Sequence, residues 1–133
     1  MALLLTTLVG CSEDKETLAS WSENGGQKHM DTIGADVTTL TRVSDPIGAD
    51  STIGPRCSQM LDDVKAARAY GELPDKGAQI SWEETLDRLK TAASHCLRNV
   101  KAGNGGASLA DAIDVQSAFH VFADRIERVR SQS

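Results

Sequence analysis

Large aromatic side chains are scarce in this sequence of 133 residues, where Phe, Trp and Tyr make up 4% of the chain. The core must therefore be built mainly from Leu, Ile, Val and Ala, and burial of these side chains alone gives a short chain only modest stability. Hydrophobic residues at 40% and charged residues at 25% are otherwise typical of a globular protein, and the length has room for one domain.

The sequence also lacks a basic cluster and a membrane-spanning apolar run. With 14 basic and 19 acidic residues its net charge is −5, which disfavours binding to nucleic acid or to anionic lipid headgroups. The apolar run at residues 1–9 is far shorter than the roughly 20 residues that a membrane-spanning helix needs. We therefore expect no nucleic-acid partner and no transmembrane helix in this run.

Patterns typical of enzymes are missing as well. His120 and Asp124 are four residues apart on one predicted helix, which offers a metal ion two ligands at most, and an exposed helix pair explains the same spacing. His95 precedes Cys96, but adjacent helical residues point about 100° apart, so we expect no activated thiol. The Gly-rich stretch at 103–106 is not followed by a P-loop lysine. The sequence predicts a non-catalytic protein without a metal or cofactor.

The N-terminal segment has the features of an export signal. Residues 1–9 are apolar, and Leu8-Val9-Gly10-Cys11 resemble the lipobox of bacterial lipoproteins. In that family a peptidase cuts before the cysteine, whose sulfur carries a diacylglyceryl group. The resemblance implies an export signal at 1–10 and a lipid on Cys11, although the segment has no Lys or Arg before its apolar run. The alternative is that residues 2–9 form an ordinary buried segment and that Cys11 is incidental.

A polar tether is expected at residues 11–27, followed by a domain at 28–133. In the stretch 28–44, apolar side chains recur every three or four residues, as in a helix, while Val37 to Val43 also alternate as in a strand. We favour a helix, because no other part of the chain offers a strand as partner. Asp45-Pro46 would end it.

Three further helices are clearer. One begins near Pro55 and ends at Gly71, a second opens with a capping box at Ser81 and Glu84, and a third begins at Ser108. Their expected apolar positions are Cys57, Met60, Leu61, Val64 and Ala67, then Trp82, Leu86, Leu89, Ala93, Cys96, Leu97 and Val100, and finally Leu109, Ala112, Ile113, Val115, Phe119, Phe122, Ile126 and Val129. Four helices with short connections predict an all-α, up-down four-helix bundle.

The remaining cysteines are spaced to form a disulfide bond. Cys57 lies 14 residues before Gly71, and Cys96 lies 15 residues after Ser81. At about 1.5 Å per residue, the two cysteines stand roughly 21 and 22 Å from the same turn, so they are level if the helices are antiparallel. Both occupy apolar stripes, and export to an oxidising compartment favours the bond.

The stretch from Asp31 onward contains a set of core and turn residues that form a pattern: Asp36, Cys57, Leu61, Asp63-Val64, Leu73-Pro74-Asp75, Trp82 and Cys96. In this pattern the stretch resembles a group of small exported actinobacterial proteins of unknown function. These residues are core and turn positions, so the resemblance implies a helical fold and a disulfide but no activity.

The function expected from these features is that of a membrane-anchored lipoprotein on the extracytoplasmic face of a cell membrane. It would act as a non-catalytic binding or structural module of the cell envelope, with an unidentified protein or envelope partner. The alternative is a small-ligand carrier or enzyme whose site lies in the bundle core near His120 and Trp82. That alternative predicts polar groups converging in an apolar cavity, whereas core packing is the simpler role for Trp82.

Overall fold

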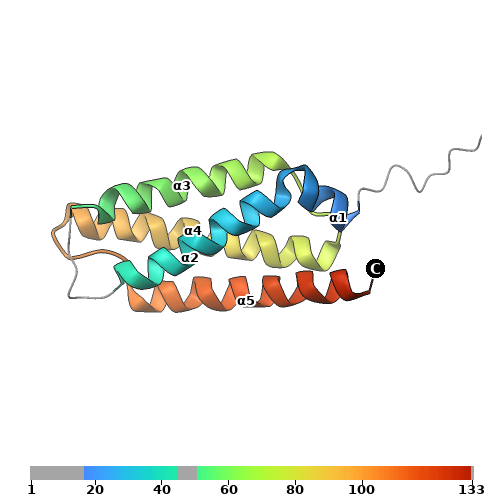
Figure 1. Cartoon of the computed structure of the whole chain (residues 1–133). Helices are drawn as coiled ribbons and strands as arrows, with labels where there is room; N and C mark the ends of the chain where they lie inside the picture. Colours follow the sequence, from blue (N-terminus) through green and yellow to red (C-terminus); the bar gives the residue numbers. More distant parts are fainter. Residues whose placement is uncertain (1–16, 45–50, 133) are drawn as a thin grey trace, which may run out of the picture.

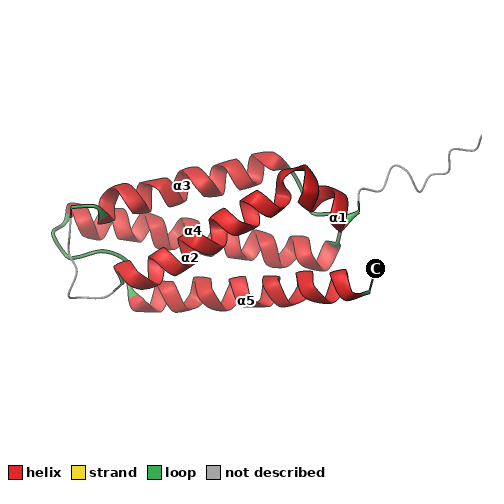
Figure 2. Ribbon diagram, in the orientation of Figure 1, coloured by secondary structure: helices red, strands yellow, loops and turns green. Residues whose placement is uncertain are grey.

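The computed structural model describes residues 17–44 and 51–132, so the segment 1–10 and Cys11 lie outside the described residues. Every regular element in the described part is a helix, as the sequence predicts (Figure 2). The elements are α1 (Leu18–Trp21), the π-helical η2 (Ser22–Gly26), α2 (Gln27–Val43), α3 (Ile53–Tyr70), α4 (Lys76–Lys101) and α5 (Leu109–Ser131). No helix in this part of the chain is long and apolar enough to cross a membrane.

The four long helices share one core. α3 packs against α4 and α4 against α5, while α2 contacts both α3 and α5 (Figure 1). Trp82 and Phe122 are each 1% exposed, and their ring centroids lie 4.6 Å apart between α4 and α5. Burial of each such side chain contributes roughly 1.5–3 kcal/mol. The predicted core position of Trp82 is confirmed.

Helices α2 and α3 match the sequence pattern. The buried residues of α2 fall three or four apart, which confirms the helical interpretation of residues 28–44. Helix α3 has Pro55 in its first turn and ends at Tyr70. Gly71 follows with φ 114°, a backbone conformation that glycine adopts without a steric penalty, so the predicted end of this helix is confirmed.

Helix α4 begins earlier than its capping-box pattern predicts. Its N-cap is Asp75, whose carboxylate accepts a hydrogen bond from the Ala78 N–H at 2.8 Å, and Ser81 lies inside the helix with its hydroxyl donating to the Gly77 carbonyl. Arg125 of α5 also donates to Asp75, at 3.0 Å. The bonds from Arg125 and from the Ala78 N–H lower the pKa of Asp75. Prediction of a helix start at Ser81 is therefore wrong, because a tertiary ion pair stabilises the earlier cap.

Helix α5 starts as predicted but presents a narrower apolar face. Ser108 is its N-cap and accepts from the Asp111 N–H at 3.1 Å. Leu109 and Ile113, predicted as core positions, are instead 60% and 50% exposed. At 100° per residue they lie far around the helix from the buried Phe122, which faces Trp82. The buried face of α5 is therefore narrower than predicted, because it does not include Leu109 and Ile113.

Helical structure also reaches into the segment that the sequence assigns to the tether. Within residues 11–27, Leu18 is 8% exposed and Trp21 is 2% exposed. The hydroxyl of Tyr70 donates to the Trp21 carbonyl at 2.8 Å, and the two rings meet edge to face at 5.4 Å. A Cβ on Gly26 would lie 2.1 Å from the Trp21 ring, so glycine makes room for the indole. This N-terminal turn is part of the core.

Candidate functional site

Cys57 and Cys96 are disulfide-bonded, as the sequence predicts. Their Cα atoms are 6.2 Å apart, within the usual range for disulfides, and both residues are 0% exposed. Cys57 lies in the second turn of α3 and Cys96 lies near the end of α4. The bond therefore fixes one end of the α3–α4 pair, while Cys11 lies outside the described residues.

The structure does not bring the sequence-predicted ligand residues together. Trp82 is buried against Phe122, whereas His120 is exposed and about 200° around α5 from Phe122. Asp124 is exposed, and it forms no ion pair with His120 among the described residues. Residues 17–44 and 51–132 contain no group of three His, Cys, Asp or Glu side chains that could hold a metal ion.

Sequence reasoning misses a contact of His95. The Nδ1 atom of His95 in α4 lies 2.7 Å from Oδ2 of Asp111 in the first turn of α5. Both side chains are partly buried, at 39% and 21% exposure. The turn at residues 103–106 brings α4 and α5 together. Contact between His95 and Asp111 also depends on how each helix is rotated about its own axis, and the spacing of apolar residues does not fix that rotation.

An acidic pair lies between α2 and α3, formed by Asp36 and Asp63. Burial of Asp36 raises its pKa to about 8, and a hydrogen bond to Asp63 and the charge of Asp63 act in the same direction. As a carboxylate, Asp36 leaves its buried Oδ2 without a hydrogen-bond donor among the described residues. A proton on Asp36 supplies the bond to Asp63, which already accepts from the Gln59 side chain at 3.0 Å. Burial and the neighbouring Asp63 therefore both favour the protonated form of Asp36.

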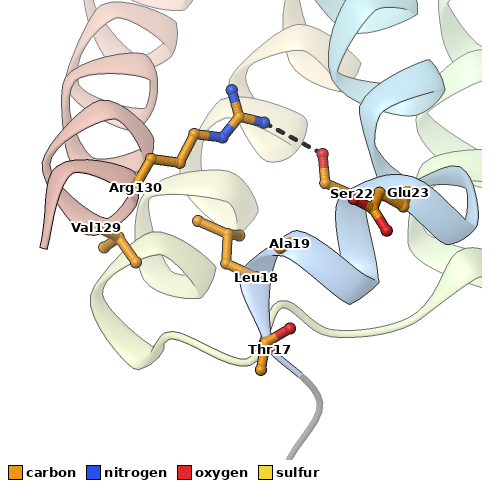
Figure 3. A pocket seen from close by; sticks show the side chains of 7 residues that line it. All are labelled: Thr17, Leu18, Ala19, Ser22, Glu23, Val129 and Arg130. Atoms are coloured by element: carbon orange, nitrogen blue, oxygen red, sulfur yellow. Dashed lines mark hydrogen bonds between the residues drawn. The ribbon is translucent and has the colours of Figure 1, made fainter. Parts of the chain in front are cut away.

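A pocket of about 350 Å³ lies where the N-terminal turn meets the end of α5 (Figure 3). It is lined by Thr17, Leu18, Ala19, Ser22, Glu23, Val129 and Arg130. The Arg130 guanidinium donates to Ser22 Oγ at 3.1 Å and to Gln27 Oε1 at 2.7 Å. Since this cation is already hydrogen bonded, its evident role is to hold η2 and the start of α2 against α5.

A second hollow, of about 380 Å³, lies on the outer side of the α3–α4 pair, and we call it the α3–α4 groove. It is lined by Leu61, Val64, Lys65, Arg68, Lys90 and Ser94. Arg68 forms an ion pair with Asp87 of α4. Lys65 and Lys90 are exposed, and the side chain of neither forms a hydrogen bond or ion pair with another described residue. Sequence periodicity places these residues beside the two stripes but does not show that they face one another.

Comparisons with known proteins give no assignment: no family model, no curated protein and no solved structure matches this chain. Its function has to be argued from its own residues.

Proposed function

We propose that this protein is a lipid-anchored module on the outer face of a cell membrane, where its helical domain binds a partner without catalysing a reaction. Residues 1–10 would serve as the export signal and Cys11 would carry the lipid. In this proposal the protein is similar to the small exported actinobacterial proteins that its core and turn residues resemble.

The disulfide between Cys57 and Cys96 is the observation that carries this proposal. Disulfides persist in oxidising compartments and are rare in the cytosol, where thiol systems keep cysteines reduced. Both cysteines belong to the core, and a cross-link at this place stabilises the domain by restricting the unfolded chain. A lipid on the third cysteine, Cys11, accounts for the odd number of cysteines in an exported chain.

We also infer that the four long helices form an up-down bundle. Two contacts between α3 and α4 support this arrangement: Cys57, early in α3, bonds to Cys96, late in α4, and Arg68, late in α3, pairs with Asp87. Arg125, late in α5, likewise reaches the start of α4. These contacts support antiparallel packing of α3 with α4 and of α4 with α5, as short connections favour, and we extend the same arrangement to α2.

Membrane fractionation of the full chain in a bacterial host tests the anchor. We expect the protein to fractionate with membranes and to incorporate labelled palmitate, since acyl chains contribute about 0.8 kcal/mol of membrane affinity per buried methylene. Cys11→Ala should lose both properties, whereas the neighbouring Ser12→Ala should keep them. An intact mass corresponding to an unmodified chain that still starts at Met1 would refute the anchor.

A further inference from the structure

The α3–α4 groove combines an apolar floor with cationic walls. Val64, which is 2% exposed, and the half-buried Leu61 form the floor. Lys65 of α3 and Lys90 of α4 stand on opposite sides, where their aliphatic stems extend the apolar surface and their ammonium groups reach solvent. A volume of about 380 Å³ falls in the range of hollows that hold ligands, roughly 300–1,000 Å³.

The charges of the groove contrast with those of the whole chain. The net charge is −5, yet three of the six side chains that line the groove are cationic. Arg68 is balanced by Asp87, and Glu83 lies 3.9 Å from it, so one end of the groove is close to neutral. The ammonium groups of Lys65 and Lys90 form no ion pair with a described residue. The groove thus offers two positive charges above an apolar floor.

The geometry points to the α3–α4 groove as a docking site for an acidic amphipathic peptide segment of a partner protein. An apolar side chain of that segment rests on Leu61 and Val64, while flanking carboxylates pair with Lys65 and Lys90. Charge complementarity of this kind fixes orientation and speeds association, while the apolar contact supplies affinity. The inference rests on the proposed function, because it specifies the partner of the binding module.

A peptide suits this groove better than a broad anionic surface does. A bilayer or a nucleic acid would also approach the acidic side chains beside the groove, among them Glu83 and Asp87, which repel it. A single extended or helical segment is narrow enough to follow the seam between two helices and to meet the lysines alone.

Binding of synthetic peptides to the purified full chain tests the inference. The probe is a fluorescent peptide of Glu-Glu-Leu-Leu repeats, compared with one of Lys-Lys-Leu-Leu repeats and one of Glu-Glu-Ser-Ser repeats. We expect the first to bind most tightly by fluorescence anisotropy, with an affinity that falls as salt is added. The double variant Lys65→Glu/Lys90→Glu should weaken this binding about tenfold, because two attractive contacts become repulsive.

The matched control is Lys28→Glu/Lys76→Glu, which changes two exposed lysines outside the groove by the same charge. It should bind the Glu-Leu peptide as the parent does. Equal weakening in both double variants, or no preference for the Glu-Leu peptide, would overturn the inference. The inference would also fail if the groove variant lost binding to vesicles of phosphatidylglycerol but still bound the peptide. These outcomes are separate from the anchor, because fractionation of the Cys11→Ala variant tests the anchor without any peptide.

Discussion

Removal of the Cys57–Cys96 bond should strongly destabilise this domain. The bond closes a loop whose ends are 39 residues apart. In the chain-entropy model such a cross-link restricts the unfolded chain by about 4 kcal/mol at 25 °C. Small domains have total unfolding free energies of roughly 5–15 kcal/mol, so this contribution is a large share.

The expected change in melting temperature follows from the size of the domain. The described part contains about 110 residues, and unfolding entropy near 60 °C is about 2.1 cal/mol/K per residue. A loss of about 4 kcal/mol should therefore lower the melting temperature by roughly 15–20 °C. Both cysteines are fully buried, so alanine is a better replacement than serine, whose hydroxyl would need a hydrogen-bond partner in the core.

Thermal unfolding followed by circular dichroism measures this change. The full chain should be compared with and without reductant, and with the variant Cys57→Ala/Cys96→Ala. The same substitution at the third cysteine, Cys11→Ala, is the control and should leave the melting temperature unchanged. If mass spectrometry shows the bond broken but the melting temperature falls by less than about 5 °C, the bond is not a major source of stability and our reasoning is wrong.

Two further changes test the electrostatics of the fold. Because the pKa of Asp36 is raised from 3.8 to about 8, the folded state binds this proton more tightly than the unfolded state does. Proton binding therefore stabilises the fold fully below about pH 4, and this stabilisation is lost as the pH rises to about 8. The parent protein should therefore lose roughly 1–2 kcal/mol of unfolding free energy over this pH window, allowing for solvent screening of a half-buried group. Asp36→Asn should abolish this loss, whereas the control Asp62→Asn should retain it. Equal pH slopes in melts of all three proteins would contradict the prediction. Asp75→Ala should lower the free energy of unfolding in urea by about 1 kcal/mol, because α4 loses its N-cap. The control Asp124→Ala, at an exposed site, should leave the urea midpoint unchanged. Equal midpoints in the two variants would show that the Asp75 cap does not stabilise the domain.

The helices could be predicted because their buried residues recur with helical periodicity. The errors arise where a contact with a residue far away in the sequence determines the local structure. Both Asp75 and Ser81 are good N-caps by local sequence, and the ion pair from Arg125, 50 residues away, stabilises the earlier one. Trp21 sits among polar and glycine residues, which suggests a tether. Its burial depends on Tyr70, 49 residues away, whose hydroxyl binds the Trp21 carbonyl.

The disulfide could be predicted because Cys57 and Cys96 both fall on the buried faces of two helices joined by a short connection. The axial estimate counted from Ser81, whereas α4 begins at Lys76, so that estimate does not hold. The groove could not be predicted, because it depends on rotation of one helix about its axis relative to the next. Lys65 and Lys90 look like ordinary exposed residues in the sequence, and only the pairing of α3 with α4 places them across a shared floor. The acidic pair Asp36 and Asp63 is hidden for the same reason, since it requires the register of α2 against α3.

The position of the disulfide has a consequence for the α3–α4 groove. Cys57 and Cys96 lie just beyond one end of it, and the ion pair of Arg68 with Asp87 lies at the other end. The spacing of the two walls is therefore set before any ligand arrives, so binding there costs little ordering of the backbone. Neither cysteine lines the groove, yet their bond also ties together the two helices that form its walls. A domain with few aromatic side chains can in this way present a defined surface.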